Sequence, residues 1–173
     1  QPSPLDCLVE RYTHHFKASL EQVFHALFLP FDTFSKILVA HDPNYQKWLF
    51  LNKQASKTAP MNSELFIYRV DSIELNKIEP HRQNPVIIDA RVARNGGSVF
   101  AYENELYRPS QRNTDGIYGR ALNINKIKKL TIDAYEEETI QIFRPNFDKN
   151  LVAMHHLHQM DDLYVFDAAY QSK

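Results

Sequence analysis

One polar stretch, residues 108–120 (RPSQRNTDGIYGR), holds most of the residues whose types could do chemistry. Arginine and glutamine side chains each form several hydrogen bonds, and a tyrosine ring offers a flat apolar face. These groups suit the binding of a hydroxyl-rich ligand. The alternative, which residue type alone favours, is that Arg108 and Gln111 only satisfy backbone groups at the end of a strand. The stretch therefore indicates a ligand class but no reaction.

Strands on either side must position this stretch. Apolar runs before Glu103 and after Asn104 predict a tight hairpin with these two residues at its tip. Pro109 is expected to end the pairing of the second strand. Residues 110–115 are all polar, so we expect them to form a loop outside the core. Residues 121–124 then resume a strand.

Composition and length limit the class of protein. The 173 residues are enough for one domain with a hydrophobic core. A formal net charge of -1 gives no reason to expect nucleic-acid binding. No apolar run reaches the length of a transmembrane segment. We expect a cytoplasmic location by default, because Cys7 is the single cysteine and the chain shows no leader at its start.

The pattern of apolar residues changes near residue 36. Before it, apolar residues recur every three or four positions over residues 5–29, which predicts a helical segment within residues 1–35. After it, short apolar runs alternate with polar turns. We therefore predict a mainly β fold over residues 36–173, as a sandwich, a barrel or a β-propeller. A weak repeat every ~50–60 residues favours the propeller.

Three runs also carry a resemblance to a known family. They are residues 84–131, from NPVIIDARV to KIKKLT, YEEE at 135–138, and HHLHQMDDLYVFDA at 155–168. They resemble the five-bladed β-propeller domain of glucosamine inositolphosphorylceramide transferase and its bacterial relatives. That domain is similar in fold to arabinanases, invertases and levansucrases. The resemblance implies a partial propeller made of the C-terminal blades only, at residues 36–80, 81–125 and 126–173.

The resemblance further implies a ligand and the residues that bind it. A propeller of this kind binds its ligand at the central axis, between the inner strands of the blades. Arg108, Gln111, Tyr118, Arg120 and His156 would then face that axis. The implied function is that of a carbohydrate-binding or accessory domain related to glycosyltransferases. Its partners would be a glycan or sugar conjugate and a transferase module.

A metal ion is a weaker expectation. In the arabinanase relatives a histidine late in the chain helps to hold a central metal, so the resemblance makes His156 and His158 weak candidates for a divalent ion such as calcium. Alternation along a strand would send these two histidines to one face and His155 to the other. No third ligand occurs at a diagnostic spacing, so we predict no metal and no cofactor.

One alternative is a propeller-type glycoside hydrolase or glycosyltransferase. Such an enzyme needs two carboxylates at a fixed separation. Asp42 and Glu64 are weak candidates at plausible blade positions, but the Asp42-Pro43 pair is more typical of a turn. The catalytic residues are therefore unknown at this point.

A second alternative follows from the number of blades. Three blades cannot close a five-fold ring, so the chain is an inactive truncated fragment, self-associates through open sheet edges, or covers an edge with its helical segment. The acidic residues 136–138 are expected to form a solvated strand edge, which also blocks edge pairing.

Overall fold

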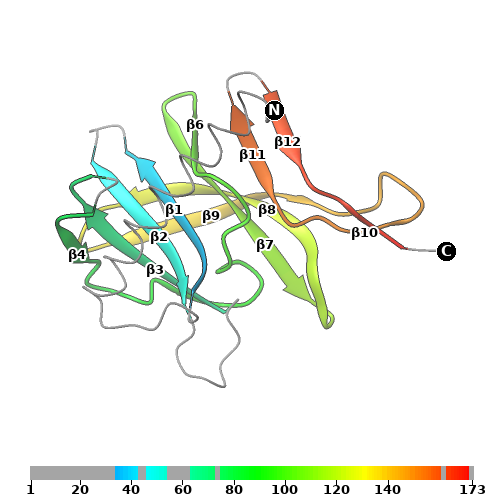
Figure 1. Ribbon diagram of the computed structural model, residues 1–173, viewed down its shortest axis with the longest axis horizontal. Helices are drawn as coiled ribbons and strands as arrows, with labels where there is room; N and C mark the ends of the chain where they lie inside the picture. The colour runs from blue at the N-terminus through cyan, green and yellow to red at the C-terminus, as the bar shows by residue number, and fades with distance from the viewer. Residues whose placement is uncertain (1–33, 43–45, 54–62, 73–74, 161–162, 172–173) are drawn as a thin grey trace, which may run out of the picture.

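The chain folds mainly as antiparallel β-sheet, as predicted. The computed structural model describes residues 34–42, 46–53, 63–72, 75–160 and 163–171 (Figure 1). The helical segment predicted within residues 1–35 lies almost wholly outside these residues. The described part holds no helix that is long and apolar enough to cross a lipid bilayer.

Within the described residues, the strands form two larger sheets and two short pairs. The first sheet has the order β1-β2-β3-β4, and β5 also pairs with β3; the second has the order β6-β7-β8-β9; β10 pairs with β13 and β11 with β12. The bounds are β1 Phe34–His41, β2 Lys47–Lys53, β3 Glu64–Val70, β4 Ile78–Pro80, β5 Ile87–Ile88, β6 Phe100–Tyr102, β7 Glu105–Thr114, β8 Ile117–Leu130, β9 Tyr135–Phe143, β10 Leu151–Ala153, β11 Leu157–Met160, β12 Leu163–Phe166 and β13 Ala169–Tyr170.

The first sheet is apolar on both faces. Successive side chains of a strand point to opposite faces. Trp48 and Phe50 of β2 accordingly join one buried cluster, and Leu49 and Leu51 join another. The continuous apolar run in β2 follows from this double burial.

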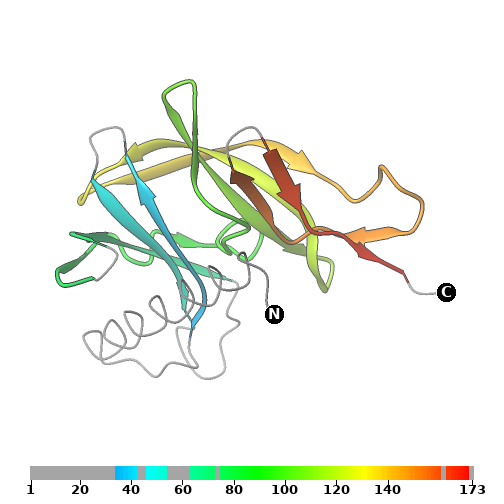
Figure 2. The ribbon, with the colours of Figure 1, turned by 45° about the horizontal axis from the view of Figure 1, so that its top comes forward.

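The cluster around Phe50 joins the two sheets. Leu106 of β7, Ile127 of β8 and Tyr135 of β9 belong to it. The rings of Phe50 and Tyr135 meet edge-on, with their centroids 6.2 Å apart. Figure 2 shows the first sheet, in blue and cyan, beside the long green and yellow strands of the second. The sheets are thus held together by apolar burial between their facing sides.

The predicted hairpin is present, but the predicted polar loop is not. Glu103 and Asn104 form the tip between β6 and β7, with φ angles of 50° and 62°. β7 then continues without a break through Pro109 to Thr114, and β8 pairs with it on the way back. The second sheet spans residues 100–143, so the blade boundary predicted at residues 125 and 126 falls inside β8.

Pro109 is tolerated within β7 because its nitrogen faces away from β8. The Pro109 carbonyl accepts a hydrogen bond from Gly96 N–H at 2.9 Å, on the other side of the strand from β8. The nitrogen and carbonyl of one strand residue point to the same side, so the missing N–H removes no bond to β8. The proline therefore does not end the strand, contrary to the prediction.

The C-terminal segment makes close backbone approaches to β8 and to the residues that precede β6. Leu157 N–H donates to the Gly96 carbonyl at 2.7 Å, and Met154 N–H donates to the Gly119 carbonyl at 2.9 Å. A Cβ atom at Gly97 would lie 1.8 Å from the Leu157 carbonyl oxygen. This approach therefore requires glycine at position 97.

Candidate functional site

Arg108 of β7 lies at the centre of a buried polar network. Its side chain is 0% exposed, and its guanidinium has five N–H donors. Nε and Nη2 donate to Oε2 and Oε1 of Glu137 at 2.8 and 2.6 Å. The other donors reach the carbonyl of Val92 at 2.8 Å, Oδ1 of Asn95 at 3.1 Å and the carbonyl of Ala93 at 3.4 Å. Arg108 therefore has no donor left over in the interior of the protein, and ligand contact by this residue stays a prediction.

Glu137 of β9 is the counter-charge of Arg108, and its side chain is only 7% exposed. The Tyr135 hydroxyl also donates a hydrogen bond to Glu137. Burial, with the nearby Glu137 carboxylate, raises the pKa of the Tyr135 hydroxyl well above its usual value. Burial lowers the pKa of the Arg108 guanidinium, but Glu137 and Tyr135 more than offset this, so its pKa is raised overall. The Arg108 guanidinium is therefore charged and the Tyr135 hydroxyl neutral at ordinary pH.

The acidic run predicted to be solvated is only partly so. Glu136 and Glu138 are exposed, whereas Glu137 turns inward. Alternation along a strand produces this difference. Tyr135, Glu137 and Thr139 follow one another at a spacing of two along β9. This spacing in the sequence could have indicated that the three side chains share the face of β9 that carries Glu137.

Asparagine side chains extend the network to the first sheet. Asn95 N–H donates to Oδ1 of Asn52 at 2.7 Å, and Asn95 Nδ2 donates to the Phe50 carbonyl at 3.3 Å. Asn52 Nδ2 in turn donates to the Ala93 carbonyl at 2.9 Å. Arg108 of the second sheet is thereby linked through Asn95 to β2 of the first.

A row of small polar side chains continues from Arg108 across the second sheet. Ser110 Oγ accepts hydrogen bonds from the amides of Asn123 and Asn125 at 3.0 and 2.9 Å. Thr139 Oγ1 donates to Oδ1 of Asn125 at 2.7 Å. Ser110, Asn123 and Asn125 are each 0% exposed. Polar residues can fill this interior because they bond to one another.

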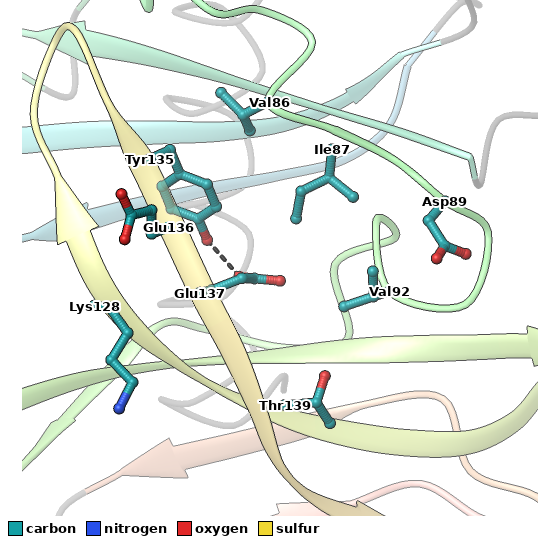
Figure 3. A pocket seen from close by; sticks show the side chains of 9 residues that line it. All are labelled: Val86, Ile87, Asp89, Val92, Lys128, Tyr135, Glu136, Glu137 and Thr139. Atoms are coloured by element: carbon teal, nitrogen blue, oxygen red, sulfur yellow. Dashed lines mark hydrogen bonds between the residues drawn. The ribbon is translucent and has the colours of Figure 1, made fainter.

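A hollow of about 540 Å³ opens beside the network. Its lining consists of Val86, Ile87, Asp89, Val92, Lys128, Tyr135, Glu136, Glu137 and Thr139. Figure 3 shows the apolar side chains of Val86, Ile87 and Val92 across from Tyr135 and Glu137 of β9. The hollow therefore has an apolar wall opposite a polar one, as small-molecule sites commonly do.

Gln111 points to the opposite face of β7 from Arg108, because the two residues differ by an odd number of positions. It is 0% exposed, and its Nε2 donates to the His155 carbonyl at 2.9 Å. Tyr118 is 48% exposed. Its ring centroid lies 5.1 Å from that of His155 and 4.9 Å from Cζ of Arg94. Gln111 and Tyr118 thus both contact His155, away from Arg108.

The predicted ligand residues therefore do not meet in one hollow. Arg120 is exposed on β8, and His156 is half-buried. The backbone N–H groups of His155 and His156 both donate to Oδ1 of Asp167 at 2.7 Å. Ligand contact by Gln111, Tyr118, Arg120 and His156 stays a prediction.

The histidines proposed as metal ligands lie together but lack a third partner in the described part of the chain. The rings of His156 and His158 stack with centroids 6.4 Å apart, so they share a side as alternation predicted. His158 Nδ1 lies 2.9 Å from Ser98 Oγ. Among the described residues, no three His, Cys, Asp or Glu side chains are grouped to hold a metal ion.

The candidate catalytic carboxylates lie at opposite ends of the first sheet. Asp42 accepts hydrogen bonds from Gln46 N–H and Trp48 Nε1, both at 3.0 Å, beside the end of β3 at Val70. Glu64 begins β3, six residues earlier, which corresponds to about 20 Å of strand. A glycosidase pair is separated by less than about 10 Å. Asp42 therefore serves the turn between β1 and β2, the alternative that residue type favoured.

Comparisons with known proteins place the chain in a family. The family model described as "Glucosamine inositolphosphorylceramide transferase 1, N-terminal" matches residues 12–170. Proteins named glucosamine inositolphosphorylceramide transferase 1 from Oryza sativa subsp. indica and subsp. japonica are each 37% identical over 97 residues, which is 55% of this chain and 13% of theirs. The protein of the same name from Arabidopsis thaliana is 33% identical over 102 residues, 58% of this chain and 13% of its own length.

These matches cover a large share of this chain but a small share of its relatives. The chain spans 13% of the length of these curated relatives. No solved structure matches. The family model, in contrast, covers most of the chain. The chain therefore belongs to the family of the N-terminal region of glucosamine inositolphosphorylceramide transferase 1.

Proposed function

We propose that this chain is a carbohydrate-recognition or accessory domain that works with a glycosyltransferase. Its family supports this proposal, because the relatives are named as transferases of a compound that contains a sugar. The proposed ligand is a sugar or sugar conjugate. The observation that carries the proposal is the hollow beside the Arg108–Glu137 pair.

The hollow suits a small sugar in size and chemistry. Its volume of about 540 Å³ lies within the range of small-molecule sites. Asp89, Glu136 and Thr139 bring oxygen atoms to its lining, and Val86 and Ile87 bring apolar surface. A pyranose presents hydroxyl groups at its edge and C–H groups on its faces, so both kinds of surface would be used.

The bonds behind the hollow favour a preformed site. Glu137 is held at both oxygens by Arg108 and at one of them by Tyr135. Thr139 is held by its bond to Asn125. A lining fixed in this way loses little conformational freedom when a ligand binds, which favours affinity.

A direct test is a titration of the ¹⁵N-labelled chain, followed by NMR, with glucosamine, N-acetylglucosamine and myo-inositol. The proposal expects backbone resonances of residues 86–92 and 135–139 to shift with at least one of these ligands. Val92→Phe would fill the hollow and abolish the shifts. Val165→Phe is the matched control, because Val165 is 55% exposed on β12, outside the lining. If none of the ligands shifts a resonance of the lining residues, the proposal is refuted, and the variants are not needed for that conclusion.

A further inference from the structure

We infer that the open edge of β12 is a docking site for an extended strand of a partner polypeptide, one whose apolar residues are flanked by lysine or arginine. β12 forms a hairpin with β11 and lies outside the lining of the hollow (Figure 1). This docking site is therefore separate from the proposed sugar site and does not depend on it.

The backbone of β12 has unpaired hydrogen-bonding groups along one side. Asp167 N–H donates to the His156 carbonyl at 3.3 Å, so the backbone groups of residue 167 point towards β11. In an antiparallel pair every second residue does the same, and the residues between them point the other way. Leu157 of β11, the partner of Phe166, accordingly donates its N–H away from β12. The N–H and C=O groups of Tyr164 and Phe166 thus point to the open edge, where they bond to no other described backbone group.

The side chains of β12 are apolar and about half exposed on both of its faces. Leu163 and Val165 lie on one face and are 56% and 55% exposed, and Tyr164 and Phe166 lie on the other and are 48% and 47% exposed. Each of these two rings meets one aromatic neighbour edge-on, on β6 and in the loop before β10, with centroids 6.4 and 6.0 Å apart. Apolar surface gathered on an edge strand in this way marks a contact with another molecule.

The unpaired backbone groups distinguish between the classes of partner that could cover these side chains. A lipid bilayer would leave the edge groups of Tyr164 and Phe166 without hydrogen bonds. A sugar would stack on the rings of one face and leave Leu163 and Val165 in water. An added β-strand bonds to the edge groups and extends both faces at once. The edge therefore fits a polypeptide strand.

Acidic residues indicate which strand fits. Asp161 and Asp162 precede β12 in the sequence, Asp167 follows it, and residues 159–171 contain no lysine or arginine. A second copy of β12 would bring the same aspartates to this edge, and like charges that lie opposite each other oppose pairing. A strand with lysine or arginine on either side of its apolar residues would be attracted instead. The expected partner is thus a different polypeptide with basic flanks.

The test adds the peptide Lys-Lys-Val-Thr-Val-Thr-Val-Thr-Lys-Lys to the ¹⁵N-labelled chain and follows hydrogen exchange by NMR. Exchange should become slower at the amides of Tyr164 and Phe166. The amides of Leu163 and Val165 already face β11 and should change little. The same peptide with aspartate in place of lysine should bind about fivefold more weakly, the size expected of a few exposed charge pairs.

Two substitutions at Tyr164 separate strand addition from adhesion to an exposed ring. Tyr164→Pro removes the outward N–H, which an edge strand tolerates when that N–H faces solvent. It should weaken peptide binding about tenfold or more, because a hydrogen bond is lost and the proline ring blocks the edge. Tyr164→Ala keeps the N–H and should weaken binding about fivefold at most. Unchanged amide resonances of β11 in both variants would show that the hairpin stays folded.

Three results would overturn strand addition at β12. They are unchanged exchange at Tyr164 and Phe166 with the lysine peptide, equal binding of the aspartate peptide, and a loss in Tyr164→Ala as large as in Tyr164→Pro. If the proline variant loses its pairing with β11, the exchange measurement on the parent protein still decides. Sugar recognition is read from resonances of residues 86–92 and 135–139, so its outcome is independent of all three results.

Discussion

Arg108 of β7 and Glu137 of β9 form a two-pronged ion pair across β8, the strand between them, with N–O distances of 2.8 and 2.6 Å. Both side chains are buried. The two residues lie on β7 and β9, on either side of β8, and they are 29 positions apart in the sequence. The pair therefore holds β9, the edge strand of the second sheet, to the asparagine network that reaches the first sheet.

Glu137→Gln should strongly destabilise the fold. The variant leaves the Arg108 charge buried without a counter-ion, which costs on the order of 3–5 kcal/mol. Glu138→Gln is the control: it breaks only the exposed pair with Lys128, and its cost should stay below about 1 kcal/mol. Urea unfolding of the two variants measures both. Equal stabilities of the two variants would show that the buried pair contributes no more than a surface pair.

Stability should fall in alkaline solution, partly because of Tyr135. Burial raises the pKa of this hydroxyl above its unfolded value of 10.0. A group whose folded pKa is raised contributes stability that is complete below the unfolded pKa and is lost as the pH rises towards the folded one. Unfolding free energies at pH ~9 and pH ~11 should therefore differ less in Tyr135→Phe than in the parent protein. An identical pH dependence in both proteins would contradict this role of Tyr135.

Gly119→Ala should cost more stability than Gly116→Ala. Both glycines have positive φ, 64° and 70°, so each alanine carries a left-handed backbone penalty of about 1–2 kcal/mol. At Gly119 the new Cβ would also lie 2.1 Å from Cδ2 of His155, whereas at Gly116 it would meet no atom within 4 Å. Thermal unfolding of the two variants isolates this clash. Equal melting temperatures would mean that the His155 ring moves aside freely.

Asp42→Ala should alter the surroundings of Trp48, the single tryptophan of the chain. The substitution removes the acceptor of both the Trp48 indole N–H and the Gln46 N–H, at a cost of about 1–3 kcal/mol. The fluorescence emission of Trp48 and urea unfolding should therefore change together. An unchanged emission spectrum and unchanged stability would show that Asp42 has no role in the turn, and would reopen its assignment as a catalytic carboxylate.

Local sequence patterns determined the strands and the hairpin tip. The short apolar runs after residue 36 predicted β-strands, and Glu103-Asn104 between apolar runs predicted the turn that the positive φ angles of both residues form. These features depend on neighbours within a few residues. Their physical causes, side-chain alternation and turn geometry, can be read from the chain itself.

Only the tertiary structure determined whether the polar residues of this stretch are exposed in a loop or buried in a strand. Ser110 and Gln111 look the same in a loop as in a buried strand, and only distant partners distinguish the two. The Ser110 hydroxyl oxygen is bonded by amides 13 and 15 residues away, and Nε2 of Gln111 bonds to a carbonyl 44 residues away. A polar group can be buried only where such partners exist. Their positions follow from the pairing of whole sheets, which no local pattern in the sequence specifies.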